Sequence, residues 1–494
     1  MPVNPGVDDD AALDLTTAAR IAGPIPQPGA CNATADLADA EVTEVDPHAD
    51  ETHGDLHRVV WKLAWPSVLA MLLQTLNSFM DRGFVGRLGP DALAAVGVGG
   101  QFMFVVFSLG MSISVGATAL VARFTGAEKP EEARIAGNQA LWIAALLSFV
   151  SIAIVLPITH VSVQFMHLSP SAAVLCEKYI KLSLIGTPGL FVMLILIGSY
   201  RGIGDTMTVL MVSVIANIIH LSGDFLLIFG SFGAPKLGLP GGAMALVTSQ
   251  YLGAILYIIL LRRTKLRGLM RSKRRLEMEW AKRILNIGVP AAMQNLSRIL
   301  SMIAFTAVLA RSADSTPAVA ALTIGLTSES IAFMPGFGFS VAASTLAGQN
   351  LGAKQPDRAE RAAWISLHQG AIVMTVMGIV FFVFAEQFAH IFTHDPAVVR
   401  LAVIYLRISA LAEPFLALGM ILTGALNGAG DTKLPAVAGV ITMWGLRLPL
   451  AYALAISFGY GAVGSWWAMS ISTIVMGIAS WGLFKMGRWK TARV

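Results

Sequence analysis

An aspartate at the end of a long apolar segment is the first residue that could do chemistry. Asp81 closes the segment 59–81, and Gln74 and Asn77 precede it at steps of three and four. Positions with this spacing share one face of a helix. A carboxylate at bilayer depth costs about 2.5–3.5 kcal/mol on insertion scales, so one that is kept there is a functional candidate. The open alternative is that Asp81 only pairs with Arg82 at the membrane surface.

A second polar face, in segment 207–230, contains a histidine. Asn217, His220 and Asp224 again follow each other at steps of three and four. If the two faces meet in one bundle, the two aspartates can share a proton or a small cation with the nearby amides. His220 could join a proton relay, because a buried imidazole beside a carboxylate can titrate near neutral pH. The alternatives are that Asp224 caps a helix end and that His220 is a hydrogen-bonding group of the core.

The C-terminal half carries a different set of charges. Its interior charged residues are Arg298, Glu329, Arg407, Glu413 and Arg447. Glu329 is the best carboxylate candidate there, although an internal pair with an arginine explains it equally well. We expect Gln74, Asn77, Glu329 and Arg298 to line a substrate cavity. The pattern fixes no metal site, although Asp81 and Asp224 could ligate Na⁺.

The composition places these residues in a membrane protein. Hydrophobic residues make up 55% of the 494 positions, charged residues only 13%, and the mean hydropathy is +0.68. Soluble domains have about 25% charged residues, so an ordinary soluble enzyme, a disordered chain and a disulfide scaffold are excluded. Nine histidines are scattered, no H-E-x-x-H spacing occurs, and two distant cysteines match no metal-ligand spacing. We therefore expect neither an enzyme nor a cofactor.

Apolar runs of about 20 residues, the length that spans a bilayer, occur twelve times. The predicted spans lie near 59–81, 92–121, 134–157, 173–199, 207–230, 240–261, 283–310, 319–347, 362–385, 399–426, 434–457 and 462–484. The predicted parts are a disordered acidic tail (1–57), an N-lobe (58–261), a basic cytoplasmic linker (262–282), a C-lobe (283–485) and a basic C-terminal tail (486–494). The tail is assigned on its twelve acidic residues and its single basic residue, Arg20.

The two halves repeat each other at a constant shift of 226 residues. Matching positions are Gly110, Ser114, Gly126, Tyr179, Gly198, Gly204 and Asp205 with Gly336, Ser340, Gly352, Tyr405, Gly424, Gly430 and Asp431. Six spans per repeat is an even number, so both halves insert in the same orientation and form a parallel repeat. We therefore predict an all-α integral membrane fold of 12 transmembrane helices in two six-helix bundles. Two like bundles can rock about a central passage.

Lysine and arginine are concentrated in alternate loops, above all in 262–283. The positive-inside rule then puts both termini in the cytoplasm of a multi-pass protein of the cell (inner or plasma) membrane. We expect the basic segment to face anionic lipid headgroups and not nucleic acid. We expect the chain to act as a monomer.

Taken together, several strings resemble the multidrug and toxic compound extrusion (MATE) family of the MOP superfamily. They are MDRGFVGRLGPDALAAVG (80–97), the GDT turns near 204 and 430, DFLLIFG (224–230), FMPGFGFSVAASTLAGQNLGA (333–353) and WGLRLPLAY (444–452). The resemblance covers about 58–485 and implies export of organic, often cationic compounds against inward H⁺ or Na⁺. It also implies a cation or proton site at Asp81 and Asp224.

Within that family the chain is closer to the DinF-type than to the NorM-type branch. The C-lobe carboxylates of the NorM-type branch align with Arg298 and Leu416 here. His220 stands where many DinF-type members have an asparagine, and Leu246 where they have a threonine. These departures favour H⁺ over Na⁺. The predicted function is therefore an H⁺-coupled antiporter that exports organic, lipophilic compounds by alternating access, and the alternative is a flippase for lipid-linked oligosaccharides or lipids.

Overall fold

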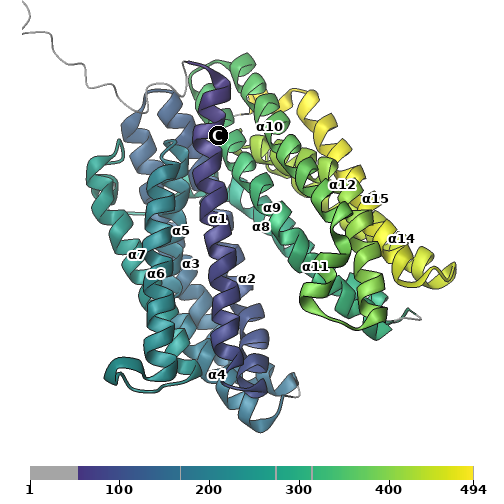
Figure 1. Ribbon diagram of the computed structural model, residues 1–494. Helices are drawn as coiled ribbons and strands as arrows, with labels where there is room; N and C mark the ends of the chain where they lie inside the picture. Colours follow the sequence, from purple (N-terminus) through teal and green to yellow (C-terminus); the bar gives the residue numbers. More distant parts are fainter. Residues whose placement is uncertain (1–53, 167, 273–274, 313–314, 493–494) are drawn as a thin grey trace, which may run out of the picture. The chain divides into compact units, whose positions relative to one another are not determined.

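Long helices joined by short turns make up the part of the chain that the computed structural model describes, residues 54–166, 168–272, 275–312 and 315–492. Figure 1 shows these helices running roughly along one direction. Eleven of them are long and apolar enough to cross a membrane, and a bent pair brings the total among the described residues to as many as twelve. The predicted all-α, twelve-span fold is confirmed. Most of the predicted acidic tail, up to residue 53, lies outside the described residues.

The first half contributes six spans, one of them made of two helices. The helices are α1 (Leu56–Gly86), α2 (Pro90–Gly126), α3 (Pro130–Phe165), α4 (Pro170–Ile185), α5 (Thr187–Gly202), α6 (Thr206–Phe229) and α7 (Leu239–Leu260). Helices α4 and α5 form the fourth span and meet at an angle of 51°. Pro188, in the first turn of α5, cannot continue the backbone hydrogen bonds of α4, and this accounts for the bend.

The second half follows the same order. Its helices are α8 (Met278–Leu309), α9 (Ser315–Gly352), α10 (Pro356–Val383), α11 (Ala385–Phe392), α12 (Pro396–Gly428), α13 (Lys433–Val440), α14 (Leu448–Tyr452) and α15 (Gly461–Lys485). Two π-helical segments, η5 (Ile441–Arg447) and η6 (Ala453–Ser457), join α13 and α14 into the fifth span of this half. We keep the names N-lobe for α1–α7 and C-lobe for α8–α15.

The repeat extends to individual hydrogen bonds. Ser114 Oγ donates to the carbonyl of Leu194 at 2.7 Å, and Ser340 Oγ donates to the carbonyl of Met420 at 3.0 Å, which is the same contact 226 residues later. The turns at Gly204 and Gly430 also match, with φ of +86° and +88°, a conformation that favours glycine. The sequence shift therefore reports a true structural duplication.

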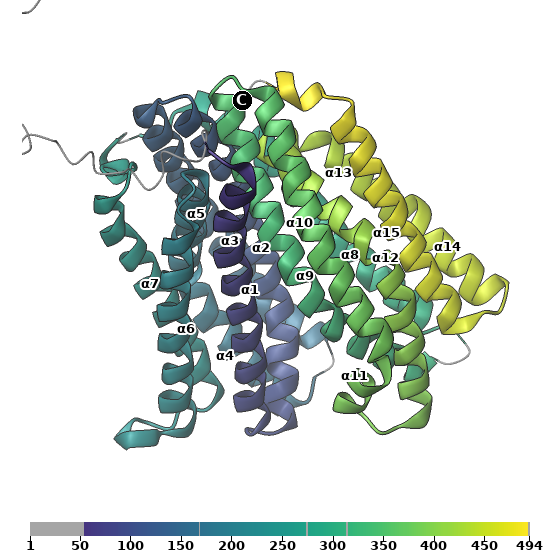
Figure 2. The same cartoon turned by 45° about the horizontal axis from the view of Figure 1, so that its top comes forward.

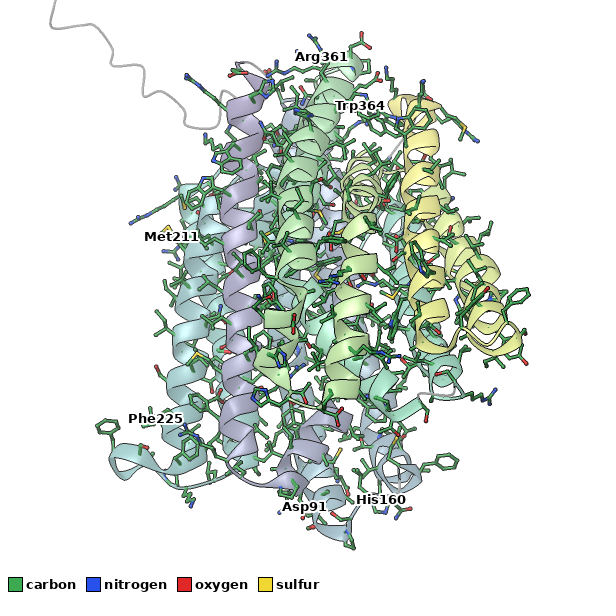
Figure 3. The ribbon with its side chains drawn as sticks, turned by 45° about the vertical axis from the view of Figure 1, so that its right-hand side comes forward. Asp91, His160, Met211, Phe225, Arg361 and Trp364 are labelled. Carbon is green, nitrogen blue, oxygen red and sulfur yellow. The ribbon has the colours of Figure 1, made fainter. Side chains whose placement is uncertain are left out.

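The two lobes touch each other near one end, which we call the basic end. Figure 3 shows Arg361 and Trp364 at this end, and Asp91 and His160 at the other, which we call the opposite end. Thr345 Oγ1 of α9 donates to the carbonyl of Arg201 at 2.9 Å, and Gln349 Nε2 donates to the carbonyl of Gly202 at 2.9 Å. These bonds join the lobes close to the turns where α5 and α9 end.

Helix α1 also crosses from one lobe to the other. At the basic end its residues Val60, Leu63 and Ala64 are buried in one apolar cluster with Phe339 and Ala342 of α9. Farther along, α1 packs against α6 of its own lobe. Figures 1 and 2 both show α1 at the boundary between the lobes. A movement of α1 against α6 would therefore be felt at the contact between lobes.

Short segments after each lobe fold back onto its basic end. After the N-lobe, Leu269 is fully buried, and Ser272 Oγ donates to a carboxylate oxygen of Glu131 in α3 at 3.2 Å. After the C-lobe, Trp489 is fully buried, and Lys490 forms an ion pair of 2.6 Å with Glu360 in α10. Helix α8 begins at Met278, within the segment predicted as the linker.

Candidate functional site

The two faces of α6 explain how the site is positioned. Met211 and Phe225 are exposed and point away from the bundle in Figure 3, as residues that face lipid would. His220 and Asp224 lie on the other face and are buried. Asp205 accepts a hydrogen bond from the backbone N–H of Thr208 at 2.9 Å and so caps the start of this helix. The GDT turn is thus a helix cap.

Helix α1 brings the second aspartate to the first. One ligand atom from each of Asp81, His220 and Asp224 can be chosen so that all three lie within 4.8 Å of one another. Asp224 is completely buried and Asp81 is half-buried. The two polar faces proposed from the sequence therefore meet, and the meeting point joins α1 to α6.

Asn77 is hydrogen-bonded to the histidine. Its amide nitrogen lies 2.9 Å from Nδ1 of His220, and Nε2 of the same ring lies 3.5 Å from a carboxylate oxygen of Asp224. Within the described residues, neither oxygen of Asp224 has a hydrogen-bond partner, nor does the amide oxygen of Asn77. Buried polar groups without partners are costly. A proton or a cation between these acceptors would remove that cost.

The remaining predicted residues of the N-lobe lie beside this group. Asn217 is half-buried, one turn before His220 on α6. Gln74 is exposed on α1, one turn before Asn77. Both are on the elements that carry the site, and Gln74 is the more accessible to a bound molecule.

A tyrosine that the sequence analysis did not assign belongs to the same group. Tyr179 of α4 interacts electrostatically with both Asp81 and Asp224. Its ring packs against Gly99 of α2, where a Cβ atom would lie 2.7 Å from the ring. The internal repeat contained the signal, because Tyr179 and Tyr405 occupy matching positions in the two lobes.

The C-lobe gathers its own polar cluster around the matching tyrosine. Tyr405 donates a hydrogen bond of 2.6 Å to Glu329, and its ring packs against Gly325, the counterpart of Gly99. Arg447 interacts electrostatically with Glu329 and donates to Ser472 at 2.7 Å. The side chains of Arg447 and Glu329 form no ion pair among the described residues, so the pairing of Glu329 with an arginine stays a prediction.

Glu413 is the second acid of this cluster. Its side chain is 1% exposed, and neither of its oxygens has a hydrogen-bond partner among the described residues. It interacts electrostatically with Glu329 and packs against Gly378 of α10. Arg298 of α8 is exposed, one turn before the fully buried Ser301 on the same helix. Arg407 is exposed and lies over the ring of Phe382, with 5.8 Å between its guanidinium carbon and the ring centroid.

Two duplicated helical lobes with ionisable residues buried between their helices define a membrane transport protein. The model of the family described as MatE matches residues 66–226 and 290–453, more than half of the chain. The chain therefore belongs to the MATE family of transporters.

Relatives and solved structures agree with this assignment. A probable multidrug resistance protein NorM of Thermotoga maritima is 30% identical over 450 residues, which cover 89% of this chain and 94% of that protein. An FAD transporter of Shewanella oneidensis is 28% identical over 432 residues, covering 86% and 94%. A structure titled as the outward-facing conformation of a multidrug resistance MATE family transporter of the MOP superfamily has a TM-score of 0.84 at 21% identity, covering 90% and 99%.

Proposed function

We propose that this protein is a secondary active antiporter that exports organic, lipophilic compounds in exchange for protons that move inward. The observation that carries the proposal is the buried group formed by Asp81, Asn77, His220 and Asp224. Ionisable side chains inside a membrane bundle mark ion or substrate paths, and proton relays are built from such groups. The names of the relatives, which refer to multidrug resistance and in one case to FAD transport, support export of organic compounds.

Alternating access supplies the mechanism. With the lobes in contact at the basic end, Asp81 and Asp224 take up a proton from the opposite end, because burial favours the neutral form of a carboxyl group. Neutralisation lowers the cost of burying the pair, so α1 moves against α6 and alters its contact with α9. The substrate leaves, the lobes reopen at the basic end, and the proton is released there. Each charge that moves inward contributes about 2.3 kcal/mol per 100 mV of membrane potential.

His220 is the reason to propose H⁺ over Na⁺. Na⁺ is a hard cation that binds oxygen ligands, as Ca²⁺ and Mg²⁺ do. The group offers an imidazole nitrogen in place of the amide oxygen expected for a Na⁺ site, and that nitrogen can carry a proton itself. His220→Asn should therefore lower H⁺-driven export and should create a response to a Na⁺ gradient that the wild type lacks. A wild-type protein driven equally well by Na⁺ would refute the H⁺ assignment.

Several finer points belong to the same proposal. The basic end is cytoplasmic, with both termini inside and the protein in the cell membrane, on the distribution of lysine and arginine. The chain works as a monomer. The DinF-type assignment rests on Arg298 and Leu416 alone, since the relatives include several named NorM. These relatives give no support to the flippase alternative.

Purified protein in proteoliposomes provides the test. Export of a fluorescent lipophilic dye should run uphill when a pH gradient is imposed, and Asp224→Asn or Asp81→Asn should abolish the uphill part. Uphill export is lost because the amide cannot take up and release a proton. Passive exchange of the dye without a gradient should persist in both variants. Uphill export that survives in both variants would reject the coupling role.

Asp91 offers the matched control. Its carboxylate lies at the opposite end of the N-lobe, bonded to Ser169 at 2.8 Å and to Ser171 (Figure 3). Asp91→Asn removes one carboxylate from the same end without touching the buried group. Uphill export by this variant should match that of the wild type.

A further inference from the structure

One arginine of the C-lobe, Arg298, has no ion-pair partner among the described residues. Arg298 lies in the middle of α8, ten residues beyond Gly288, or about 15 Å at 1.5 Å per residue. At Gly288 the helix is pressed against α2, where a Cβ atom would lie 2.9 Å from the carbonyl of Ser112. Arg298 is thus well past the contact between α2 and α8.

The direction of its side chain follows from the helix. Ser301 and Phe305, at steps of three and four along α8, are completely buried within the C-lobe. Arg298 begins this row, yet it is exposed. A charged side chain on a spanning helix faces the bundle interior or a water-filled cavity. Arg298 therefore stands at the accessible end of the row that Ser301 and Phe305 continue into the C-lobe.

The acids nearby do not neutralise this arginine. Among the described residues no carboxylate forms an ion pair with Arg298. Glu329 accepts a hydrogen bond of 2.6 Å from the hydroxyl of Tyr405 and interacts electrostatically with Arg447, while Glu413 is only 1% exposed. Arg447 itself lies near enough to Arg298 to repel it. Two neighbouring guanidinium groups are costly unless an anion lies between or beside them.

A flat apolar surface lies next to the arginine. The indole nitrogen of Trp444 donates to Ser297, the neighbour of Arg298, at 2.9 Å, and its side chain is exposed. Trp444 belongs to the π-helical segment η5, which ends at Arg447. Such segments are frequent at functional sites. Together Arg298 and Trp444 offer a planar double donor beside an aromatic face.

We propose that Arg298 and Trp444 form a subsite that binds the acidic group of a lipophilic molecule, with Arg447 adding positive charge behind it. A guanidinium binds carboxylate, sulfonate or phosphate with two parallel hydrogen bonds, and an indole packs on the attached rings. The subsite rests on the proposed transport function and narrows its substrates to amphiphiles that carry an acid.

A matched pair of dyes tests this directly. Rhodamine B has a free carboxylate, and its methyl ester has the same rings without the acid. Wild-type protein in nanodiscs of neutral lipid should bind the acid about tenfold more tightly than the ester, the effect of a charge-assisted hydrogen bond. Arg298→Gln should remove the preference by weakening the acid only, and Arg298→Glu should reverse it.

The controls separate this subsite from other effects. Arg407→Gln removes the exposed arginine that lies over Phe382, and it should leave the binding of both dyes unchanged. Arg298→Lys keeps the charge but loses the planar fork, so it should show an intermediate preference even if Arg298→Gln folds poorly. Equal binding of the two dyes by the wild type, or an unchanged preference in the folded Arg298→Gln variant, would overturn the proposal.

The assay also identifies the source of the anion and is independent of coupling. If phosphatidylglycerol in the nanodisc competes with rhodamine B, the anionic group is that of a lipid; if it does not, the ligand is a soluble compound. The ratio of the two dye affinities is measured without a gradient, so it does not depend on proton coupling. Failure of uphill export with an intact dye preference would reject the antiporter and leave the subsite in place.

Discussion

The N-lobe and the C-lobe share a backbone and differ in what they bury. Each lobe presses a tyrosine onto a glycine, Tyr179 onto Gly99 and Tyr405 onto Gly325. Beside Tyr179 the N-lobe places two aspartates and a histidine, and Arg82 interacts electrostatically with Asp81. The C-lobe cluster contains two glutamates and an arginine. Duplication has preserved the packing, while the ionisable groups have diverged.

The difference also concerns which helices carry the acids. In the N-lobe they come from α1 and α6, and α1 also packs against α9 of the other lobe. In the C-lobe they come from α9 and α12, two long helices packed along each other within that lobe. A change of charge in the N-lobe can therefore move the contact between lobes, whereas one in the C-lobe acts within a packed core.

The largest expected effect tests whether proton coupling depends on the acids of the N-lobe and not on those of the C-lobe. Asp224 and Glu413 are equally buried, and the oxygens of both lack hydrogen-bond partners among the described residues. Asp224→Asn should abolish uphill export in proteoliposomes, while Glu413→Gln should leave the coupling ratio between protons and dye unchanged. Equal loss of coupling in the two variants would mean that the lobes are alike in function.

The second expected effect concerns the closure at the basic end. A Cβ atom on Gly352 would overlap the carbonyl of Arg123, and one on Gly126 would overlap the carbonyl of Gln349. Gly352→Ala should therefore disfavour the conformation described here. A tenfold shift of the equilibrium between this conformation and its alternative corresponds to about 1.4 kcal/mol. Leu76 is an exposed residue of α1, so a cysteine introduced by Leu76→Cys reports access to this helix. The background carries Cys31→Ser, which removes a second thiol. In this background Gly352→Ala should slow the labelling of the introduced cysteine, because the opposite end closes. Gly482→Ala is the control, because a Cβ atom there meets nothing within 4 Å.

The two tyrosines should differ in their contribution to stability. Tyr405→Phe leaves the half-buried Glu329 without its hydroxyl donor, a loss of about 1–3 kcal/mol for an acceptor left unsatisfied inside the bundle. Tyr179→Phe removes a hydroxyl whose interactions with Asp81 and Asp224 are only electrostatic, so its effect on the free energy of unfolding should be smaller. Thermal unfolding of the two variants in one detergent measures the difference. A larger loss from Tyr179→Phe would contradict the assigned contacts.

Much of this could be predicted from the chain alone. The long apolar runs and the shift of 226 residues predict the fold, because a helix of this length spans the bilayer and satisfies its own backbone hydrogen bonds in lipid. The steps of three and four placed Asn77 and Asp81 on one face of a helix, and Asn217, His220 and Asp224 on one face of another. A helical period cannot say which faces meet, so the contact between Asn77 and His220 needed the structure.

Other features lie beyond what local patterns encode. Tyr179 and Tyr405 are ordinary aromatic residues in apolar runs, and their roles depend on the glycines of a distant helix. The bend between α4 and α5 divides what reads as one apolar run, and Pro188 marks its place without giving its angle. The π-helical segment that ends at Arg447 packs against α15 and is followed by Pro449, but the apolar run itself does not predict a change of helical period.

The smallest expected effect is a difference in salt dependence between the two short segments that fold back onto the basic end, one after each lobe. Lys490 bonds to Glu360 at 2.6 Å, and this hydrogen bond raises the pKa of Lys490. A raised lysine pKa stabilises the fold at neutral pH, and the contribution is lost as the pH rises through that pKa. Lys490→Met should therefore lower the free energy of unfolding at pH 7 by less than about 1 kcal/mol, and added salt should shrink this loss.

The segment after the N-lobe contacts Glu131 through the hydroxyl of Ser272, so Ser272→Ala should show a loss of stability that does not respond to salt. Salt dependence in Ser272→Ala and none in Lys490→Met would reverse this distinction between the lobes.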